Sequence, residues 1–112
     1  MNVMWLIGAL LALYVARFLW FRVRAKEAKR LVAEGASLVD VRTAQEYARG
    51  HLDGARNIPV HEIGARAKKE IPRGKPVVVY CASGMRSAAA ASVLRRAGFE
   101  KVVNLGPMSA WG

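Results

Sequence analysis

The run from Val77 to Tyr80 consists only of β-branched or aromatic residues, with no polar alternation. Such a run is typical of a strand that is covered on both faces, as in a parallel sheet flanked by helices. The rest of the chain alternates between strand and helix patterns, and this alternation predicts an α/β domain with a mainly parallel sheet. We expect strands at 37–41, 77–80 and 102–105, and helices at 26–34, 43–48, 60–70 and 88–97.

Cys81, the only cysteine in the chain, ends this run and opens a glycine-containing loop. The alanine-rich helix that follows has Ser87 as its predicted N-cap and Gly98 as its predicted stop. Ligands of open α/β sheets bind beyond the carboxyl ends of the strands, and amides at a helix start lower a thiol pKa from about 8.5 to about 3.5–7.5. The layout therefore predicts a nucleophilic thiolate at Cys81, with an inert buried cysteine as the alternative.

Arg86 falls at the start of the same predicted helix. A cation there meets the positive end of the helix dipole and is disfavoured unless an anion compensates it. The expected anion is the Cys81 thiolate, a bound substrate or both, and a solvated arginine is the alternative.

Several short motifs join the cysteine loop at a consistent spacing. They are Asp40-Val41-Arg42, Glu46-Tyr47, Gly50-His51, Asn57-Ile58-Pro59 and the pattern Cys-x-x-Gly-x-Arg-Ser from Cys81 to Ser87. Together, over about residues 29–111, they make the chain resemble the rhodanese family of sulfurtransferases. The resemblance implies a rhodanese-like three-layer domain at residues 29–112.

The resemblance also implies a chemistry for the loop. Cys81 would be the catalytic nucleophile that carries a sulfane sulfur as a persulfide, between an anionic donor such as thiosulfate and a thiol or cyanide acceptor. The implied substrate-binding residues are Ala82, Ser83, Gly84, Met85, Arg86 and Ser87. No metal and no cofactor are implied. In this family four residues between the cysteine and the arginine, as here, accompany sulfur transfer, whereas five accompany phosphatases and arsenate reductases.

Near its end the chain departs from the family pattern. The family has paired glycines before a tryptophan, whereas Pro107 follows Gly106 here and Trp111 comes four residues later. Because proline fixes φ and lacks an amide donor, we expect a differently shaped flanking loop. This departure favours a second hypothesis, a catalytically weak binding module that tethers a cytosolic partner to the membrane. The third hypothesis is that the protein is a phosphatase or an arsenate reductase.

The amino-terminal segment is apolar enough to suggest a membrane anchor. Residues 3–16 carry no charge, and a helix over residues 3–23 would be about 31 Å long, close to the roughly 30 Å of a bilayer's hydrocarbon. Trp5 and Trp20 would mark the two interfaces, and Arg17 can snorkel to the headgroups. A re-entrant or interfacial segment is the alternative. A cleaved signal peptide is disfavoured, because the cations follow the apolar run.

The distribution of cations predicts the orientation of the anchor. No lysine or arginine precedes the apolar core, whereas six follow it: Arg17, Arg22, Arg24, Lys26, Lys29 and Arg30. The positive-inside rule then places the amino terminus outside the cell and the catalytic domain in the cytoplasm. We expect residues 24–35 to form a basic juxtamembrane helix, with the lipid bilayer as its partner.

The net charge of +10 could also suggest that the protein binds nucleic acid. The chain has no nucleic-acid-binding motif, however, and we expect it to bind no nucleic acid. Gly8, Ala12 and Ala16 lie on one face of the predicted span, where small residues permit close pairing of two helices. A homodimer through this face is therefore a further hypothesis.

A structural role is one of two interpretations of Asp40 and Arg42 and is the expected role of His51. Asp40 and Arg42 could position a substrate or form an ion pair that braces the loop. His51 is expected to make a structural hydrogen bond.

Overall fold

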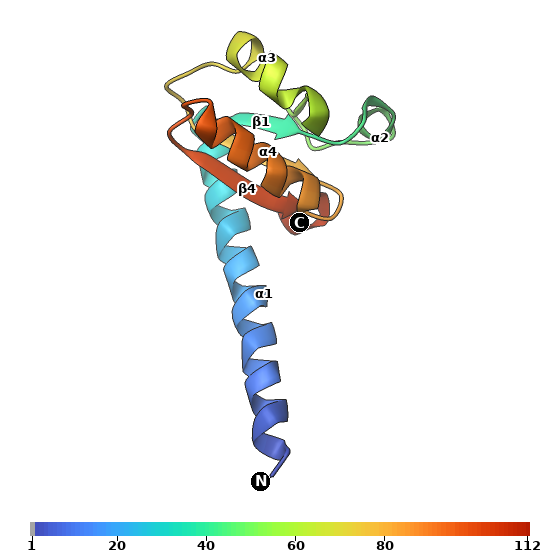
Figure 1. Ribbon diagram of the computed structural model, residues 1–112, viewed down its shortest axis with the longest axis vertical. Helices are drawn as coiled ribbons and strands as arrows, with labels where there is room; N and C mark the ends of the chain where they lie inside the picture. The colour runs from blue at the N-terminus through green and yellow to red at the C-terminus, as the bar shows by residue number, and fades with distance from the viewer. Residues whose placement is uncertain (1) are drawn as a thin grey trace.

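The computed structural model describes residues 2–112, without the side chain of residue 21. The described chain is one long helix followed by an α/β domain (Figure 1). The helices are α1 (Met4–Ala33), α2 (Ala44–Ala48), α3 (Ile63–Glu70) and α4 (Met85–Arg96), with two 3-10 turns, η1 (Val60–Glu62) and η2 (Met108–Trp111). The strands are β1 (Ser37–Asp40), β2 (Arg56–Asn57), β3 (Val77–Cys81) and β4 (Val102–Pro107).

The four described strands form one sheet in the order β2-β1-β3-β4, and all neighbours run parallel. Every residue of β3 is buried, which confirms the sequence-based prediction of a strand covered on both faces. The prediction missed β2, because its two residues, Arg56 and Asn57, have no apolar pattern. The sheet therefore matches the predicted α/β class.

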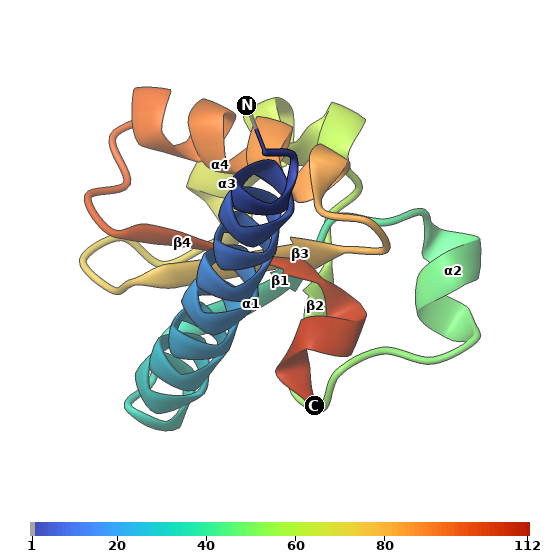
Figure 2. The ribbon, with the colours of Figure 1, turned by 90° about the horizontal axis from the view of Figure 1, so that it is seen from below.

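Helices cover both faces of the sheet (Figure 2). α3 and α4 lie on one face, over a core that includes Val79, Ile58 and Leu94. The carboxyl-terminal part of α1 lies on the other face with η2, over a core that includes Leu31 and Tyr80. The domain thus has three layers, as expected.

α1 has two contrasting halves. Every described residue from Asn2 to Val23 whose side chain is placed is exposed, and the first buried residue of the helix is Ala25. Its most apolar 18-residue window has a mean hydropathy of 1.8 and is 0 % buried, so by length and composition the helix could cross a membrane. Beyond this window Ala28 and Leu31 pack against the sheet, and the helix stops before Gly35, whose φ is +107°.

The prediction that Ser87 caps the helix after Cys81 is wrong. α4 begins at Met85, and its N-cap is Gly84, whose φ of +99° is left-handed and which makes no side-chain cap. Ser87 therefore lies inside the first turn, where its hydroxyl is used within the loop. The predicted stop is confirmed, because Gly98 has a φ of +98° and the Phe99 amide donates to the Leu94 carbonyl at 3.1 Å.

Other predicted elements also differ from the structure at their ends. The helix predicted at 60–70 begins as the 3-10 turn η1 before α3. The last strand continues past the predicted residue 105 to Pro107, because Tyr80 and Cys81 pair with Gly106 and Pro107 after an irregularity in the register. The turn η2 then ends the described chain.

Candidate active site around Cys81

Cys81 is the last residue of β3 and pairs with Pro107 at the end of β4. Asp40 ends β1 and pairs with Tyr80, the residue before Cys81. Because the strands are parallel, these carboxyl ends lie along one edge of the sheet. This edge is where ligands of open α/β sheets bind, as the sequence predicted for Cys81.

The Cys81 sulfur is surrounded by donors from its own loop. The Gly84 amide donates to Sγ at 2.9 Å, and the Ser87 amide donates at 3.4 Å. Sγ in turn donates to Ser87 Oγ at 3.4 Å, and that hydroxyl donates to the Gly84 carbonyl at 3.1 Å. The strand end, the left-handed glycine and the first turn of α4 together form a small ring of polar groups around one sulfur.

Two opposing effects set the acidity of the Cys81 thiol. Burial raises its pKa, because a charged sulfur is poorly solvated away from water. The hydrogen bond between the sulfur and the Ser87 side chain, and the bonds from the amides of Ser87, Gly84 and Ser83, lower it. The hydrogen bonds together outweigh burial, so the pKa of Cys81 lies below that of an ordinary cysteine. The loop therefore favours the thiolate, which is the nucleophilic form.

The sulfur is closed to solvent in this structure. Cys81 and Ser87 have no exposed surface, and Cys81 belongs to the core between the sheet and α4. In contrast, Ala82, Ser83 and Met85 are exposed, and Met85 is 80 % exposed. The loop thus presents its outer side to solvent and holds its sulfur inward.

Gly84 fits the loop closely against the end of β4. A Cβ at this position would lie 3.5 Å from Gly106 Cα and 3.6 Å from Pro107 Cδ, and the φ of +99° is one that side-chain-bearing residues rarely adopt. Pro107, which departs from the family pattern, is therefore part of the wall beside the cysteine loop. The flanking segment, which the sequence predicts to differ in shape from that of the family, consists of the end of β4 and η2.

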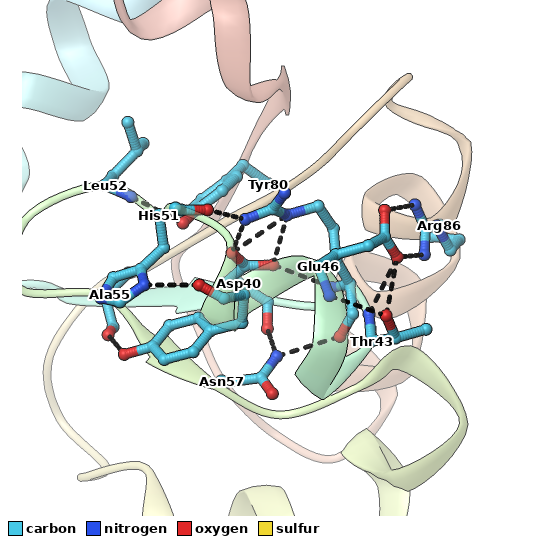
Figure 3. Close-up of polar contacts among 12 residues, drawn as sticks. Asp40, Thr43, Glu46, His51, Leu52, Ala55, Asn57, Tyr80 and Arg86 are labelled. Carbon is cyan, nitrogen blue, oxygen red and sulfur yellow. Dashed lines mark hydrogen bonds and ion pairs between the residues drawn. The ribbon is translucent and has the colours of Figure 1, made fainter.

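Arg86 contacts a carboxylate that the sequence analysis did not propose as its partner. Its guanidinium makes a two-pronged pair with Glu46, with Nη1 at 2.7 Å from Oε1 and Nη2 at 3.0 Å from Oε2 (Figure 3). Hydrogen bonds from Arg86 and then from the Thr43 amide lower the pKa of Glu46 to about 2. The carboxylate that pairs with Arg86 at the start of α4 is thus Glu46, and the charge of the Cys81 thiolate acts on Arg86 as a smaller effect.

Glu46 also forms a capping box with Thr43 at the start of α2. The Glu46 carboxylate accepts bonds from the Thr43 amide and hydroxyl, each at 3.1 Å, while it also pairs with Arg86. The available signal was the need of Arg86 for an anion. A carboxylate on a helix after a neighbouring parallel strand was a candidate for that role.

Asp40 and Arg42 form an ion pair. Such a pair, bracing the loop, is one of the two roles that the sequence analysis considers for them. Asp40 has no exposed surface and Arg42 is 7 % exposed. Arg42 Nη2 lies 2.6 Å from Asp40 Oδ2 and 2.7 Å from the Gly50 carbonyl oxygen (Figure 3). Hydrogen bonding to Asp40 raises the pKa of Arg42, which keeps the guanidinium charged despite burial. The pair ties β1 to the segment after α2.

The residues between β1 and β2 complete this network. His51 stacks on the ring of Tyr47 with 3.6 Å between ring centroids, and its Nδ1 lies 2.8 Å from the Tyr47 carbonyl oxygen, which confirms its structural role. Tyr47 donates to the Ala55 carbonyl at 2.6 Å, and Asn57 Nδ2 donates to the carbonyls of Asp40 and Arg42 (Figure 3). α2, and with it Glu46, is held in place by these contacts. Within residues 2–112 no three His, Cys, Asp or Glu side chains group as metal ligands would.

Comparison with known proteins identifies the family of this fold and loop. The profile of the rhodanese-like domain matches residues 24–112. A sulfurtransferase of Allochromatium vinosum is 43 % identical over 79 residues, which cover 70 % of this chain and 73 % of that protein. The thiosulfate sulfurtransferase GlpE of Pseudomonas entomophila is 35 % identical over 91 residues, with 80 % and 83 % covered.

Among solved structures, the human single-domain sulfurtransferase TSTD1 superposes with a TM-score of 0.67 at 32 % identity, covering 77 % of this chain and 89 % of that one. A buried cysteine at the end of the central strand, amide donors around its sulfur and a match over the whole α/β domain point to one conclusion. The chain belongs to the rhodanese-like domain family and is a rhodanese-type sulfurtransferase.

Proposed function

We propose that Cys81 carries a sulfane sulfur as a persulfide, taken from a small anionic donor such as thiosulfate and passed to a thiol or to cyanide. The observation that carries this proposal is the ring of loop donors around Sγ, with the Gly84 amide at 2.9 Å. Amide dipoles that stabilise a thiolate also stabilise the anionic terminal sulfur of a persulfide. The thiosulfate sulfurtransferase relative supports the choice of donor.

The proposed reaction has two displacement steps. In the first, the Cys81 thiolate attacks the outer sulfur of thiosulfate, the S–S bond of thiosulfate breaks, and sulfite leaves with the electron pair. In the second, cyanide or a thiolate attacks the terminal sulfur of the persulfide and regenerates the Cys81 thiolate. The chain has no second cysteine, so the acceptor is external.

The proposed roles of the loop residues follow from their positions. The backbone from Ala82 to Ser87 forms the cradle, and Arg86 binds the anionic donor while Glu46 holds its guanidinium at the site. Because Cys81 has no exposed surface, the donor reaches the sulfur only when the exposed side of the loop moves outward. The exposed residues on that side of the loop are Ala82, Ser83 and Met85.

Sulfur loading tests this proposal directly. The purified chain is incubated with thiosulfate, and mass spectrometry should show one added sulfur atom on Cys81, which cyanide removes as thiocyanate. Cys81→Ser should take up no sulfur. Arg86→Ala should raise the KM for thiosulfate, whereas Arg96→Ala, an exposed arginine on the same helix, should not. A chain that never gains the sulfur would favour the binding-module hypothesis, because its thiol stays buried.

We further propose that residues 3–23, from the N-cap of α1 onward, span the membrane, with the basic segment at 24–35 inside and the domain at 29–112 in the cytoplasm. The exposed apolar half of α1 and the absence of lysine or arginine before it support this arrangement. The packing of Ala25, Ala28 and Leu31 on the sheet supports a domain held close to the bilayer surface.

Extraction and labelling test the span and its orientation. The full chain should remain in membranes washed with alkaline carbonate, and Leu11→Arg at the middle of the span should release it, whereas Leu11→Ala should not. In a Cys81→Ser background, a cysteine introduced by Asn2→Cys should react with an impermeant maleimide added to intact cells. Labelling only after the cells are broken would show that the amino terminus lies inside the cell, which is the opposite of the proposed orientation.

A further inference from the structure

Two arginines from different helices meet at the free edge of the sheet. β4 is the last strand in the order, so its outer side pairs with no other described strand. Arg24 of α1 donates to the Asn104 carbonyl at 2.9 Å, and Arg95 of α4 donates to the Val102 carbonyl at 3.0 Å. These carbonyls are two residues apart and point to the same side of β4. The two cations are therefore held side by side along one strand edge.

A cavity of about 260 Å³ opens between these arginines. Its walls come from α1, α4 and β4 and include Trp20, Val23, Arg24, Glu27, Arg95 and Asn104. The Arg24 guanidinium lies 3.5 Å from the centroid of the Trp20 ring, which fixes its plane beside the cavity. A guanidinium carries more N–H donors than its one carbonyl contact uses, so each arginine can also bind an anion.

The charges around the cavity favour an anion. Burial lowers the pKa of Arg24, the positive charge of Arg95 lowers it further, and the Glu27 carboxylate raises it. Glu27 is the carboxylate in the wall, and its Oε1 lies 3.1 Å from Lys101 Nζ outside the cavity. Arg24, Arg95 and Lys101 carry three positive charges against the one negative charge of Glu27, so a net charge of +2 is left for a ligand to balance.

The cavity lies where the proposed span ends. Trp20 marks the predicted interface, and Arg24 is the first residue after residues 3–23. Phospholipid phosphates lie just outside the hydrocarbon, at the level of this tryptophan. We propose that the cavity binds the phosphate of one anionic phospholipid of the inner leaflet between Arg24 and Arg95. This proposal rests on the proposed membrane span and adds a defined lipid site to it.

Native mass spectrometry of the full chain in detergent tests the site. The chain should retain phosphatidylglycerol in preference to phosphatidylcholine. Arg24→Gln with Arg95→Gln should weaken phosphatidylglycerol retention about a hundredfold, because a charge-assisted hydrogen bond worth about tenfold is lost at each arginine. The matched control is Arg22→Gln with Arg96→Gln, which removes the same charge from the same two helices outside the cavity and should retain the lipid.

The two double variants distinguish a defined lipid site from diffuse attraction between a basic domain and an anionic lipid. Equal loss in both would overturn the proposal in favour of diffuse attraction, and unchanged retention in both would overturn it outright. Displacement of the lipid by millimolar inorganic phosphate or glycerol phosphate would assign the cavity to a soluble phosphate instead. If thermal unfolding shows that the double variant is not folded, lipid retention is measured for the single variant Arg95→Gln instead. Arg95 is exposed, so this substitution should leave the chain folded. Carbonate extraction of the unmodified chain reports separately on the span.

Discussion

The cysteine loop, residues 81–87, and the bracing segment, residues 40–57, lie at the same edge of the sheet but are built differently. The loop holds its sulfur with backbone amides from residues three and six positions further along the chain. The bracing segment holds Arg86 with the Glu46 carboxylate, forty positions away, and holds itself with side-chain contacts. The first arrangement is local and depends on backbone conformation. The second depends on the whole sheet having formed.

Removing the centre of the bracing segment should have the largest effect. Asp40→Ala leaves the buried Arg42 without its carboxylate, and breaking a buried ion pair from one side costs about 3–5 kcal/mol of the free energy of unfolding. Urea denaturation measures this loss. Asp53→Ala, at an exposed carboxylate of the same segment, is the control and should change stability by less than about 0.5 kcal/mol. Equal stability of the two variants would show that the pair does not brace the segment.

A change of backbone conformation in the cysteine loop should have the second-largest effect. Gly84→Ala forces a side chain into a φ of +99°, which costs about 1–2 kcal/mol, and it moves the amide that donates to Sγ. Both stability and the rate of sulfur loading should fall. The matched change Gly64→Ala, inside α3 and in ordinary contact with Val93, should leave the rate unchanged and not destabilise the chain. Normal sulfur loading by the Gly84→Ala variant would show that the amide geometry is not needed.

The same contrast explains what the sequence could predict. The loop was identified because an apolar strand, a lone cysteine, a glycine and a helix follow one another within a few residues, and each has a local signature. Its details were less predictable. Ser87 has the composition of an N-cap, but the left-handed Gly84 lets the helix begin earlier, so Ser87 Oγ faces the sulfur.

Long-range features were beyond sequence reasoning. The pairing of Glu46 with Arg86 requires β1 and β3 to be neighbours, and nothing in the local pattern fixes that order. β2 has only two residues and no apolar alternation, so it forms because Asp40 and Val39 offer it a partner edge. The closure of Cys81 from solvent is likewise a result of packing between the sheet and α4.

Within the loop, the Ser87 hydroxyl should have a smaller and more specific effect. Ser87→Ala removes the side-chain hydrogen bond that lowers the pKa of Cys81 and leaves the Gly84 carbonyl without its partner, at a cost of about 1 kcal/mol. The pH midpoint for persulfide formation should move to higher pH. Ser83→Ala is the control, because it leaves the backbone amide of Ser83 in place. An unchanged midpoint in Ser87→Ala would mean that amides alone set the acidity of the thiol.

The smallest effect should come from the charge that links the two regions. Glu46 and Arg86 are about one-third exposed, so Glu46→Gln should cost less than about 1 kcal/mol at neutral pH. The pKa of Glu46 is about 2 in the folded chain against an ordinary 4.5, so its contribution is complete above pH 4.5 and is lost as the pH falls towards 2. The difference in unfolding free energy between the unmodified chain and Glu46→Gln should therefore shrink over that window. The control is Glu100→Gln, at an exposed carboxylate, for which the difference in unfolding free energy should not change over this pH window. If the difference for Glu46→Gln also stays constant with pH, Glu46 acts on Arg86 through its shape and not through its charge.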